Sequence, residues 1–374
     1  MTYSLLSVGL VLVVALITSL LSKRIKVPIV VLEIVIGILL GNSWLGILGE
    51  DVYLNFFSNL GLIFLLFLAG LEMGIKMFKR ESLLIALASF GTPFIIGMIL
   101  GRIYEISPLL IGVLLSTTSV GVVLSVVREL ELTEEIRDII LESSLMVDAL
   151  SMFALTVSLE AEKGTSCSSI LLSSLSALAL FAIPVLVRRT RIKKYLSKWL
   201  ATESHFKHEV RFCLALTVII AGLFEILGFH AILGSFLAGL IISEVTEEGD
   251  ALREKLLGLG YGFFIPFFFV IAGAVVNIPL LAEGGKISLI PALLIAGLGG
   301  KILGVGITSK LLGIPSNTSL GIGTLHSARL SLIIAGAKLG LDLGLLTQPI
   351  YSAIVIFSLI TVIISPMIAK AIMR

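Results

Sequence analysis

The sequence predicts an all-α polytopic membrane protein with about thirteen transmembrane helices. Of its 374 residues, 57% are hydrophobic and 14% are charged, and the mean hydropathy is +1.13. A soluble domain has about 25% charged residues, and this much apolar surface would not stay soluble. The composition therefore disfavours a soluble enzyme, a disordered chain and a nucleic-acid-binding protein. The two cysteines, Cys167 and Cys213, are too few for a disulfide framework or a thiolate metal site.

Apolar windows of about 20 residues mark the expected spans. They cover 3–22, 28–47, 55–75, 82–103, 107–127, 136–160, 167–188, 207–227, 229–245, 257–281, 286–309, 317–338 and 346–371. The second and the ninth are the weakest because of their length. The first is not expected to be a signal peptide, because no basic segment precedes it and no small-residue cleavage site follows it.

Lysine and arginine are divided unequally between the two sets of loops. The odd-numbered loops and the C-terminal tail hold 21 of the 27 basic residues, and the even-numbered loops hold four. Because cytoplasmic loops are enriched in Lys and Arg, we expect a plasma-membrane protein with its N-terminus outside and its C-terminus in the cytoplasm. The most basic loop, 189–211, is expected to lie along the cytoplasmic surface as an amphipathic connector without activity.

Two pairs of segments indicate an internal repeat. PIVVLEIVIGILLG (28–41) is similar to HAILGSFLAGLIIS (230–243), and GLIFLLFLAGLEMGI (61–75) is similar to GFFIPFFFVIAGAVVNI (262–278). The offset is about 202–203 residues in both pairs, and it places the two copies in opposite topology, as in secondary transporters. Chance similarity between Gly- and Leu-rich spans is the alternative. We expect one transporter domain over 1–374, with inverted repeats at about 28–160 and 229–371 joined by a linker helix and basic loop at about 167–211.

Ionisable residues at bilayer depth are costly and usually functional. The candidates are Glu33, Glu142, Asp148, Glu225, Lys301, His326 and Arg329. Asp148 lies near the middle of the sixth span, and Ser144 lies one helical turn earlier on the same face. A carboxylate and a hydroxyl together offer hard oxygen ligands to a monovalent cation, and the carboxylate can hold a proton instead. The alternative is a structural hydrogen bond to a neighbouring helix.

Two spans are interrupted by polar residues. The fifth contains LLSTTSVGVV (114–123) and the twelfth contains SLGIGTLHSARLSLII (319–334). If the fifth span unwinds here, it presents carbonyls and the hydroxyl of Thr117 or Thr118 to an ion beside Asp148. The alternative is an ordinary span whose hydroxyls bond to their own helix. A pair of interrupted spans in corresponding halves is typical of a transporter binding site.

Three cationic or basic residues accompany these spans. Arg329 keeps its charge and therefore needs an acidic partner or water; Glu142 and Glu33 are available, and Glu142 is favoured, although a structural role for Arg329 outweighs substrate binding. Lys301 is surrounded by small residues that allow close helix approach. Its amine either neutralises the empty carboxylate or links the broken helices, with snorkelling to the cytoplasmic face as the alternative. His326 is interpreted as a hydrogen-bonded polar residue and not as a proton relay.

These segments resemble the sodium/proton exchanger family of the monovalent cation:proton antiporter superfamily. VPIVVLEIVIGILLGNSWLGIL (27–48) resembles the opening helix of the family, LLSTTSVGVV its unwound helix, and RLSLIIAGAKLG (329–340) its final crossing helix. The resemblance covers about residues 25–370, and the order of the motifs is more specific than any one of them.

The resemblance implies two crossed discontinuous helices, a core domain, a dimerisation domain and a homodimer. It places Asp148 on the ion-binding aspartate, Thr118 or Thr117 on the unwound-helix threonine, and Ser144 on the serine one turn before the aspartate. Lys301 falls on a lysine that some branches carry. Many members have Asp or Asn where this chain has Val147, and the single carboxylate suggests electroneutral one-for-one exchange. Some branches have Glu where this chain has Ser143. Arg329 falls where several relatives have Glu.

We therefore predict a monovalent cation:proton antiporter that serves pH homeostasis. Na⁺ is the expected cation, with K⁺ or Li⁺ as alternatives, and the cation and the proton compete for Asp148 during alternating access. No cofactor is expected, and the expected partners are the cation, the proton, membrane lipid and a second copy of the chain. A sodium-coupled symporter of an organic anion is the main alternative, and a gated channel is another. The spans contain no paired aspartates and no Ser/His or zinc motif, so an enzyme is not expected.

Overall fold

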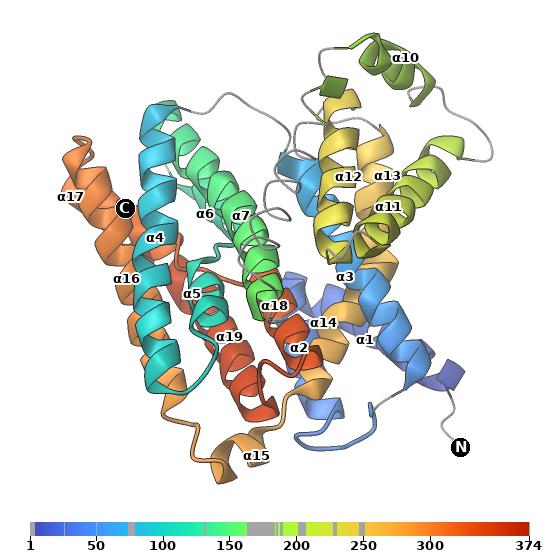
Figure 1. The fold of residues 1–374 in the computed structure, drawn as a ribbon, viewed down its shortest axis with the longest axis horizontal. Helices are drawn as coiled ribbons and strands as arrows, with labels where there is room; N and C mark the ends of the chain where they lie inside the picture. Colours follow the sequence, from blue (N-terminus) through green and yellow to red (C-terminus); the bar gives the residue numbers. More distant parts are fainter. Residues whose placement is uncertain are drawn as a thin grey trace. The chain divides into compact units, whose positions relative to one another are not determined.

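The computed structural model describes residues 4–373, apart from 26, 50, 74–78, 131, 163–183, 185, 188–189, 201–206, 227–229 and 247–250. The described residues form helices joined by turns, and none of them lies in a β-strand (Figure 1). The chain divides into two compact units, Met1–Lys76 with Gly164–Ala274, and Met77–Lys163 with Val275–Arg374. The first is called unit 1 and the second unit 2.

Unit 1 contains the helices that precede residue 76 and those between residues 191 and 275. They are α1 (Ser4–Ile25), α2 (Ile29–Leu40), α3 (Val52–Met73), α10 (Arg191–Leu200), α11 (His208–Ile226), α12 (Ala231–Val245), α13 (Ala251–Leu259), the π-turn η1 (Gly260–Phe264) and α14 (Ile265–Val275). Unit 2 contains α4 (Arg80–Ile103), α5 (Pro108–Ser116), α6 (Val120–Glu129), α7 (Glu134–Glu162), α15 (Ile278–Glu283), α16 (Leu289–Leu311), α17 (Ser316–Leu325), α18 (Ser331–Asp342) and α19 (Gln348–Met373).

The predicted spans agree with these helices to within a few residues at most ends. Among the described residues, eight helices, counting α5 with α6 and α13 with α14, are long and apolar enough to cross a membrane, and α2 and α12 are shorter apolar helices. The second and ninth spans are thus the short ones, as predicted. The predicted span at 167–188 lies almost wholly outside the described residues. The helix α2 ends at Leu40, seven residues before the predicted end, because the chain turns at Gly41 and the Asn42 N–H donates to the Ala274 carbonyl at 2.9 Å.

Glycines bring the helices of unit 1 together in two equivalent crossings. A Cβ on Gly37 of α2 would collide with the backbone at Val270, and one on Gly273 of α14 would collide with the backbone at Ile34. The other crossing joins α12 and α3 in the same way, since Gly239 faces Phe67 and Gly70 faces Phe236. Gly37 and Gly239 are the residues that the internal repeat aligns, as are Gly273 and Gly70. The two crossings therefore have the geometry expected of repeated copies, which supports the inverted repeat.

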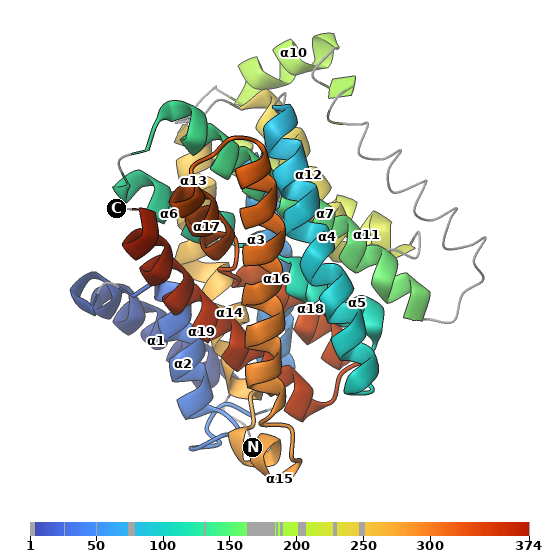
Figure 2. The ribbon, with the colours of Figure 1, turned by 90° about the vertical axis from the view of Figure 1, so that its left-hand side faces the viewer.

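Unit 2 packs α16 closely against α4 (Figure 2). A Cβ on Gly304 would meet Thr92 and the Ala88 carbonyl, and one on Gly300 would approach the Cα of Pro93 to 3.0 Å. The prediction that small residues around Lys301 allow a close helix approach is confirmed. The approach carries the Lys301 side chain into the interior of unit 2, where it is fully buried.

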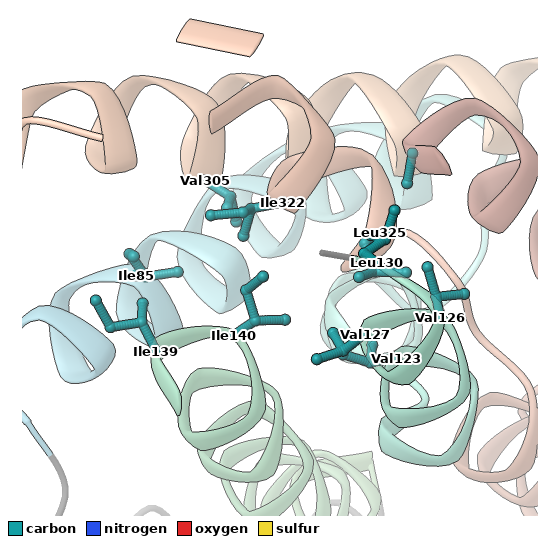
Figure 3. Close-up of a cluster of buried hydrophobic side chains, with 11 residues drawn as sticks. Ile85, Val123, Val126, Val127, Leu130, Ile139, Ile140, Val305, Ile322 and Leu325 are labelled. Atoms are coloured by element: carbon teal, nitrogen blue, oxygen red, sulfur yellow. The ribbon is translucent and has the colours of Figure 1, made fainter. Parts of the chain in front are cut away.

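Both polar-interrupted spans of unit 2 are discontinuous helices, as predicted. Residues 117–119 separate α5 from α6, and residues 326–330 separate α17 from α18. A hydrophobic cluster packs beside these breaks; it joins α4, α6, α7, α16, α17 and α19 (Figure 3). Its members are Ile85, Val123, Val126, Val127, Leu130, Ile139, Ile140, Val305, Ile322, Leu325 and Ala369. The cluster packs one half-helix from each break, α6 and α17, against the neighbouring helices of unit 2.

Candidate functional site

The break after α5 leaves main-chain carbonyls without their usual helical donors. The last turn of any helix has such carbonyls, and inside a membrane protein they need other partners. The Thr117 hydroxyl donates to the Leu114 carbonyl at 2.8 Å. The next two carbonyls, of Leu115 and Ser116, accept hydrogen bonds from the side chains of Arg329 and Lys301. Both side chains are cations at the C-terminal end of α5, where the helix dipole favours positive charge.

Arg329 is fully buried, and its hydrogen bonds to the described residues all go to main-chain carbonyls. Its Nε and Nη2 atoms donate to the Leu115 carbonyl at 3.0 and 2.6 Å. Nη2 also donates to the Gly297 carbonyl at 2.9 Å, and Nη1 donates to the Ser327 carbonyl at 2.8 Å. The guanidinium lies 5.4 Å from the centroid of the Phe357 ring. Arg329 therefore joins α5, α16 and the second break through its hydrogen bonds.

Lys301 is also fully buried, so it does not snorkel to the surface. Its Nζ donates to the Ser116 carbonyl at 2.6 Å, the Thr118 hydroxyl at 2.8 Å and the Ser89 hydroxyl at 2.9 Å. These three bonds use all three donors of an ammonium group. Of the two roles considered from the sequence, the hydrogen bonds favour the link to the broken helix.

The two breaks touch each other directly. The Thr118 hydroxyl donates to the His326 carbonyl at 3.0 Å, and the Ser119 N–H donates to the Ala328 carbonyl at 2.8 Å. The Arg329 carbonyl accepts a bond from the Ser358 hydroxyl at 2.9 Å. The discontinuous helices therefore cross at their unwound segments, with four half-helix ends meeting in one place.

Asp148 and Ser144 are carried on α7 beside this crossing. Ser144 is fully buried, whereas Asp148 is half-buried. The Ser144 hydroxyl donates to the Ile140 carbonyl at 2.7 Å and lies 3.3 Å from Nε2 of His326. Since His326 also bonds to Thr118 through its carbonyl, the structure brings together Ser144, the first break and the second break. His326 itself is fully buried and hydrogen-bonded, in agreement with the sequence-based interpretation.

The remaining ionisable candidates lie elsewhere. The expectation that Glu142 pairs with Arg329 is wrong: Glu142 accepts bonds from the Lys79 N–H at 3.1 Å and the Ser82 hydroxyl at 2.6 Å. The sequence could not reveal this, because the partners of Arg329 are main-chain carbonyls: those of Leu115 and Ser327, which lie at the breaks, and that of Gly297 on α16. Glu33, the other suggested partner, is buried in α2 of unit 1. Glu225 is exposed near the end of α11.

Ser89 is a member of this cluster that sequence reasoning missed. It lies on α4, is fully buried, and contacts both Lys301 and Nδ1 of His326, the latter at 3.1 Å. A single serine within an apolar span gives no periodic signal, so only the packing of α4 against α16 identifies it.

Discontinuous helices that cross at a polar centre, within a protein of many apolar helices, define a secondary transporter. Comparison with known proteins identifies the family of transporters. The model of the transmembrane sodium/hydrogen exchanger family matches residues 10–374, and the chain belongs to that family. The probable Na(+)/H(+) antiporter 3 of Methanocaldococcus jannaschii is 30% identical over 361 residues, which are 93% of this chain and 91% of the relative. The Na(+)/H(+) antiporter of Enterococcus hirae is 29% identical over 379 residues, 96% of each chain.

A solved structure has the same fold. The sodium proton antiporter MjNhaP1 of Methanocaldococcus jannaschii matches with a TM-score of 0.78, over 99% of this chain and 98% of that one. The two sequences are 17% identical, so this likeness concerns the fold alone. It confirms the predicted fold class, an all-helical membrane protein with crossed discontinuous helices.

Proposed function

We propose that this chain is a secondary active antiporter that exchanges a monovalent cation for protons. Its relatives named Na(+)/H(+) antiporters support this function, and Na⁺ is the proposed cation, with K⁺ or Li⁺ as alternatives. Neither the family nor these relatives support the alternative of a sodium-coupled organic anion symporter.

The main-chain carbonyls of Thr117 and Thr118 carry this proposal. No residue in the described part of the chain donates a hydrogen bond to either carbonyl, although the carbonyls of Leu115 and Ser116 just before them are both bonded. Polar groups at bilayer depth require partners, and carbonyl oxygens are hard ligands suited to cations. We propose that a dehydrated monovalent cation binds these carbonyls together with oxygens on α7.

The α7 ligands in this proposal are the Asp148 carboxylate and the Ser144 hydroxyl. Ser144 shares His326 with Thr118, and Asp148 lies one helical turn after Ser144 on α7. The carboxylate then holds either a cation or a proton, never both. Competition for one carboxylate makes exchange obligatory, provided that the site opens to one side of the membrane at a time.

We propose that the exchange is one cation for one proton and therefore electroneutral. The exchange reaction then uses one carboxylate, Asp148. Lys301 is the group that could alter the stoichiometry by releasing a proton during the cycle. Its three donors are bonded to Ser116, Thr118 and Ser89, so deprotonation would leave at least one of these acceptors without its donor.

The surroundings of the protein are proposed on the charge distribution and the family. The excess of basic residues in the odd-numbered loops supports a plasma-membrane protein with an external N-terminus and a cytoplasmic C-terminus. We also propose a homodimer in contact with membrane lipid, as the resemblance implies. Cysteine labelling from each side of intact cells tests the orientation, and cross-linking in the membrane tests the dimer.

Reconstitution into proteoliposomes that contain a pH-sensitive dye tests the function. Adding Na⁺, Li⁺ or K⁺ to one side should draw protons to that side from the other, and collapsing the membrane potential should leave the rate unchanged. Asp148→Asn should abolish the signal for every cation. Asp138→Asn is the matched control, because Asp138 lies on the same helix but is exposed and paired with Lys79 at 3.0 Å. Full activity of Asp148→Asn would refute the mechanism.

A further inference from the structure

His326, in the break after α17, connects α4 and α7 of unit 2 through its ring. Nδ1 lies 3.1 Å from the Ser89 hydroxyl of α4, and Nε2 lies 3.2 and 3.3 Å from the hydroxyls of Ser143 and Ser144 on α7. The ring is fully buried. The proposed exchange mechanism makes no use of His326, although Ser144, which the ring contacts, is one of the proposed cation ligands.

The hydrogen bonds around the ring assign its proton. The Ser89 oxygen accepts a bond from Lys301 at 2.9 Å, so the Ser89 proton is available for Nδ1. On the other side, the Ser143 hydroxyl donates to the Ile139 carbonyl at 2.6 Å, and the Ser144 hydroxyl donates to the Ile140 carbonyl at 2.7 Å. Both serine oxygens are therefore acceptors toward the ring. A neutral imidazole with its proton on Nε2 satisfies this set of donors and acceptors, and it is the tautomer that we assign.

This arrangement gives the hydrogen bonds one direction. They run from the Lys301 ammonium through the Ser89 hydroxyl to Nδ1, and from the Nε2 proton to the oxygens on α7. At Ser144, one lone pair receives the Nε2 proton while the hydroxyl proton is held on its own helix. A hydroxyl oxygen has two lone pairs, so one remains to ligate a cation.

We propose that His326 is a positioning residue for cation binding, which keeps the Ser144 hydroxyl in the orientation of a ligand. Without the Nε2 donor, the hydroxyl can rotate and donate to the Asp148 carboxylate one turn along α7. Ionised acceptors form the stronger bonds, and such a bond would stabilise the carboxylate in the absence of a cation. His326 thus favours cation binding without touching the cation. This inference rests on the proposed function.

Exchange kinetics test the role of the ring. His326→Leu should raise the apparent KM for Na⁺ about tenfold, the effect of losing roughly one hydrogen bond, while kcat changes less than about twofold. His326→Gln should recover most of the affinity, because its amide oxygen accepts from Ser89 and its amide nitrogen donates to Ser144. Ser327→Ala is the matched control: Ser327 is the next residue, equally buried, and its hydroxyl donates to the Gly323 carbonyl.

A double-mutant cycle tests whether the effect passes through Ser144. In a Ser144→Ala background, His326→Leu should add almost nothing to the change in KM. If the effects of His326→Leu and Ser144→Ala on KM multiplied in the double mutant, the inference would be overturned. Equal KM values for His326→Leu and His326→Gln, or an unchanged KM in His326→Leu, would also overturn it. These outcomes differ from failure of the proposed function, in which the wild-type protein moves no protons in response to any cation.

A spectroscopic measurement tests the proton position independently of transport. The chain has four histidines. Comparing the ¹⁵N spectra of histidine-labelled wild type and His326→Gln assigns the signals of His326, because they are absent from the spectrum of the variant. At pH 7 they should report a neutral ring with its proton on Nε2. A proton on Nδ1, or on both nitrogens, would overturn the inference, and the measurement holds even if His326→Leu does not fold.

Discussion

Replacing Arg329 with methionine should destabilise unit 2 strongly. The substitution keeps much of the apolar volume but removes four hydrogen bonds, and it leaves the carbonyls of Leu115, Gly297 and Ser327 without these donors. Each buried unsatisfied acceptor costs about 1–3 kcal/mol. Gly297 lies inside α16, where its carbonyl keeps its helical donor. The carbonyls of Leu115 and Ser327 therefore give about 2–6 kcal/mol, and part of this is offset because a charge no longer has to be buried.

We therefore expect a net loss of about 3–5 kcal/mol, the range typical of removing one partner from a buried charged network. At about 2–4 °C per kcal/mol, the melting temperature should fall by roughly 10 °C. The melting temperature of Arg329→Lys should lie between those of the wild type and Arg329→Met, because one ammonium group cannot reach all three carbonyls with the geometry of a guanidinium.

Thermal unfolding of the purified protein in detergent, followed by size-exclusion chromatography after heating, measures this effect. Arg128→Met is the matched control, since Arg128 is exposed on α6 in the same unit and should shift the melting temperature by no more than about 2 °C. If Arg329→Met melted within that margin of the wild type, the assignment of Arg329 as the cap of α5 would be refuted.

Three further substitutions have defined outcomes. Gly239→Ala should cost about 3 kcal/mol because its Cβ would collide with the backbone at Phe67, whereas Gly222→Ala, with nothing within 4 Å, should be tolerated; equal melting temperatures would contradict the crossing. Lys301→Met should lower the melting temperature. Any exchange that remains should proceed at a rate that does not depend on the membrane potential. If the substitution created or removed a dependence of the exchange rate on the membrane potential, Lys301 would take part in the stoichiometry. Lys79→Met should shift the melting temperature slightly at pH 7. The hydrogen bond to Asp138 raises the pKa of Lys79 above its ordinary value of 10.5, so this difference should persist at neutral pH and disappear as the pH rises through the raised pKa; a difference that grows above pH 11 would contradict the pairing.

Most of the helices could be predicted from the sequence because a bilayer imposes a span length and an apolar composition on each of them. The breaks could also be predicted, since Thr117, Thr118 and the polar run from Thr324 to Arg329 interrupt spans that are otherwise apolar. The glycine crossings were visible as a faint repeat, because a close backbone approach excludes every side chain from Gly37 and Gly239.

The partners of the buried charges could not be predicted. A sequence shows which side chains are available, and it suggested a carboxylate for Arg329. The acceptors are instead main-chain carbonyls, which every residue possesses, and those of Leu115 and Ser327 become available because a helix ends there. The role of Ser89 depends on α16 lying against α4, a long-range packing that no local pattern reveals.

The carbonyls capped by Arg329 and Lys301 have a consequence for the speed of transport. Covalently attached cations hold the unwound segments open, so an arriving ion does not have to order them. A preorganised site avoids the entropy cost of ordering the chain when the ion binds. Such a site keeps its geometry even when its affinity for the ion is modest. Modest affinity allows a bound ion to leave quickly once the site faces the other side, and rapid release is what high turnover requires.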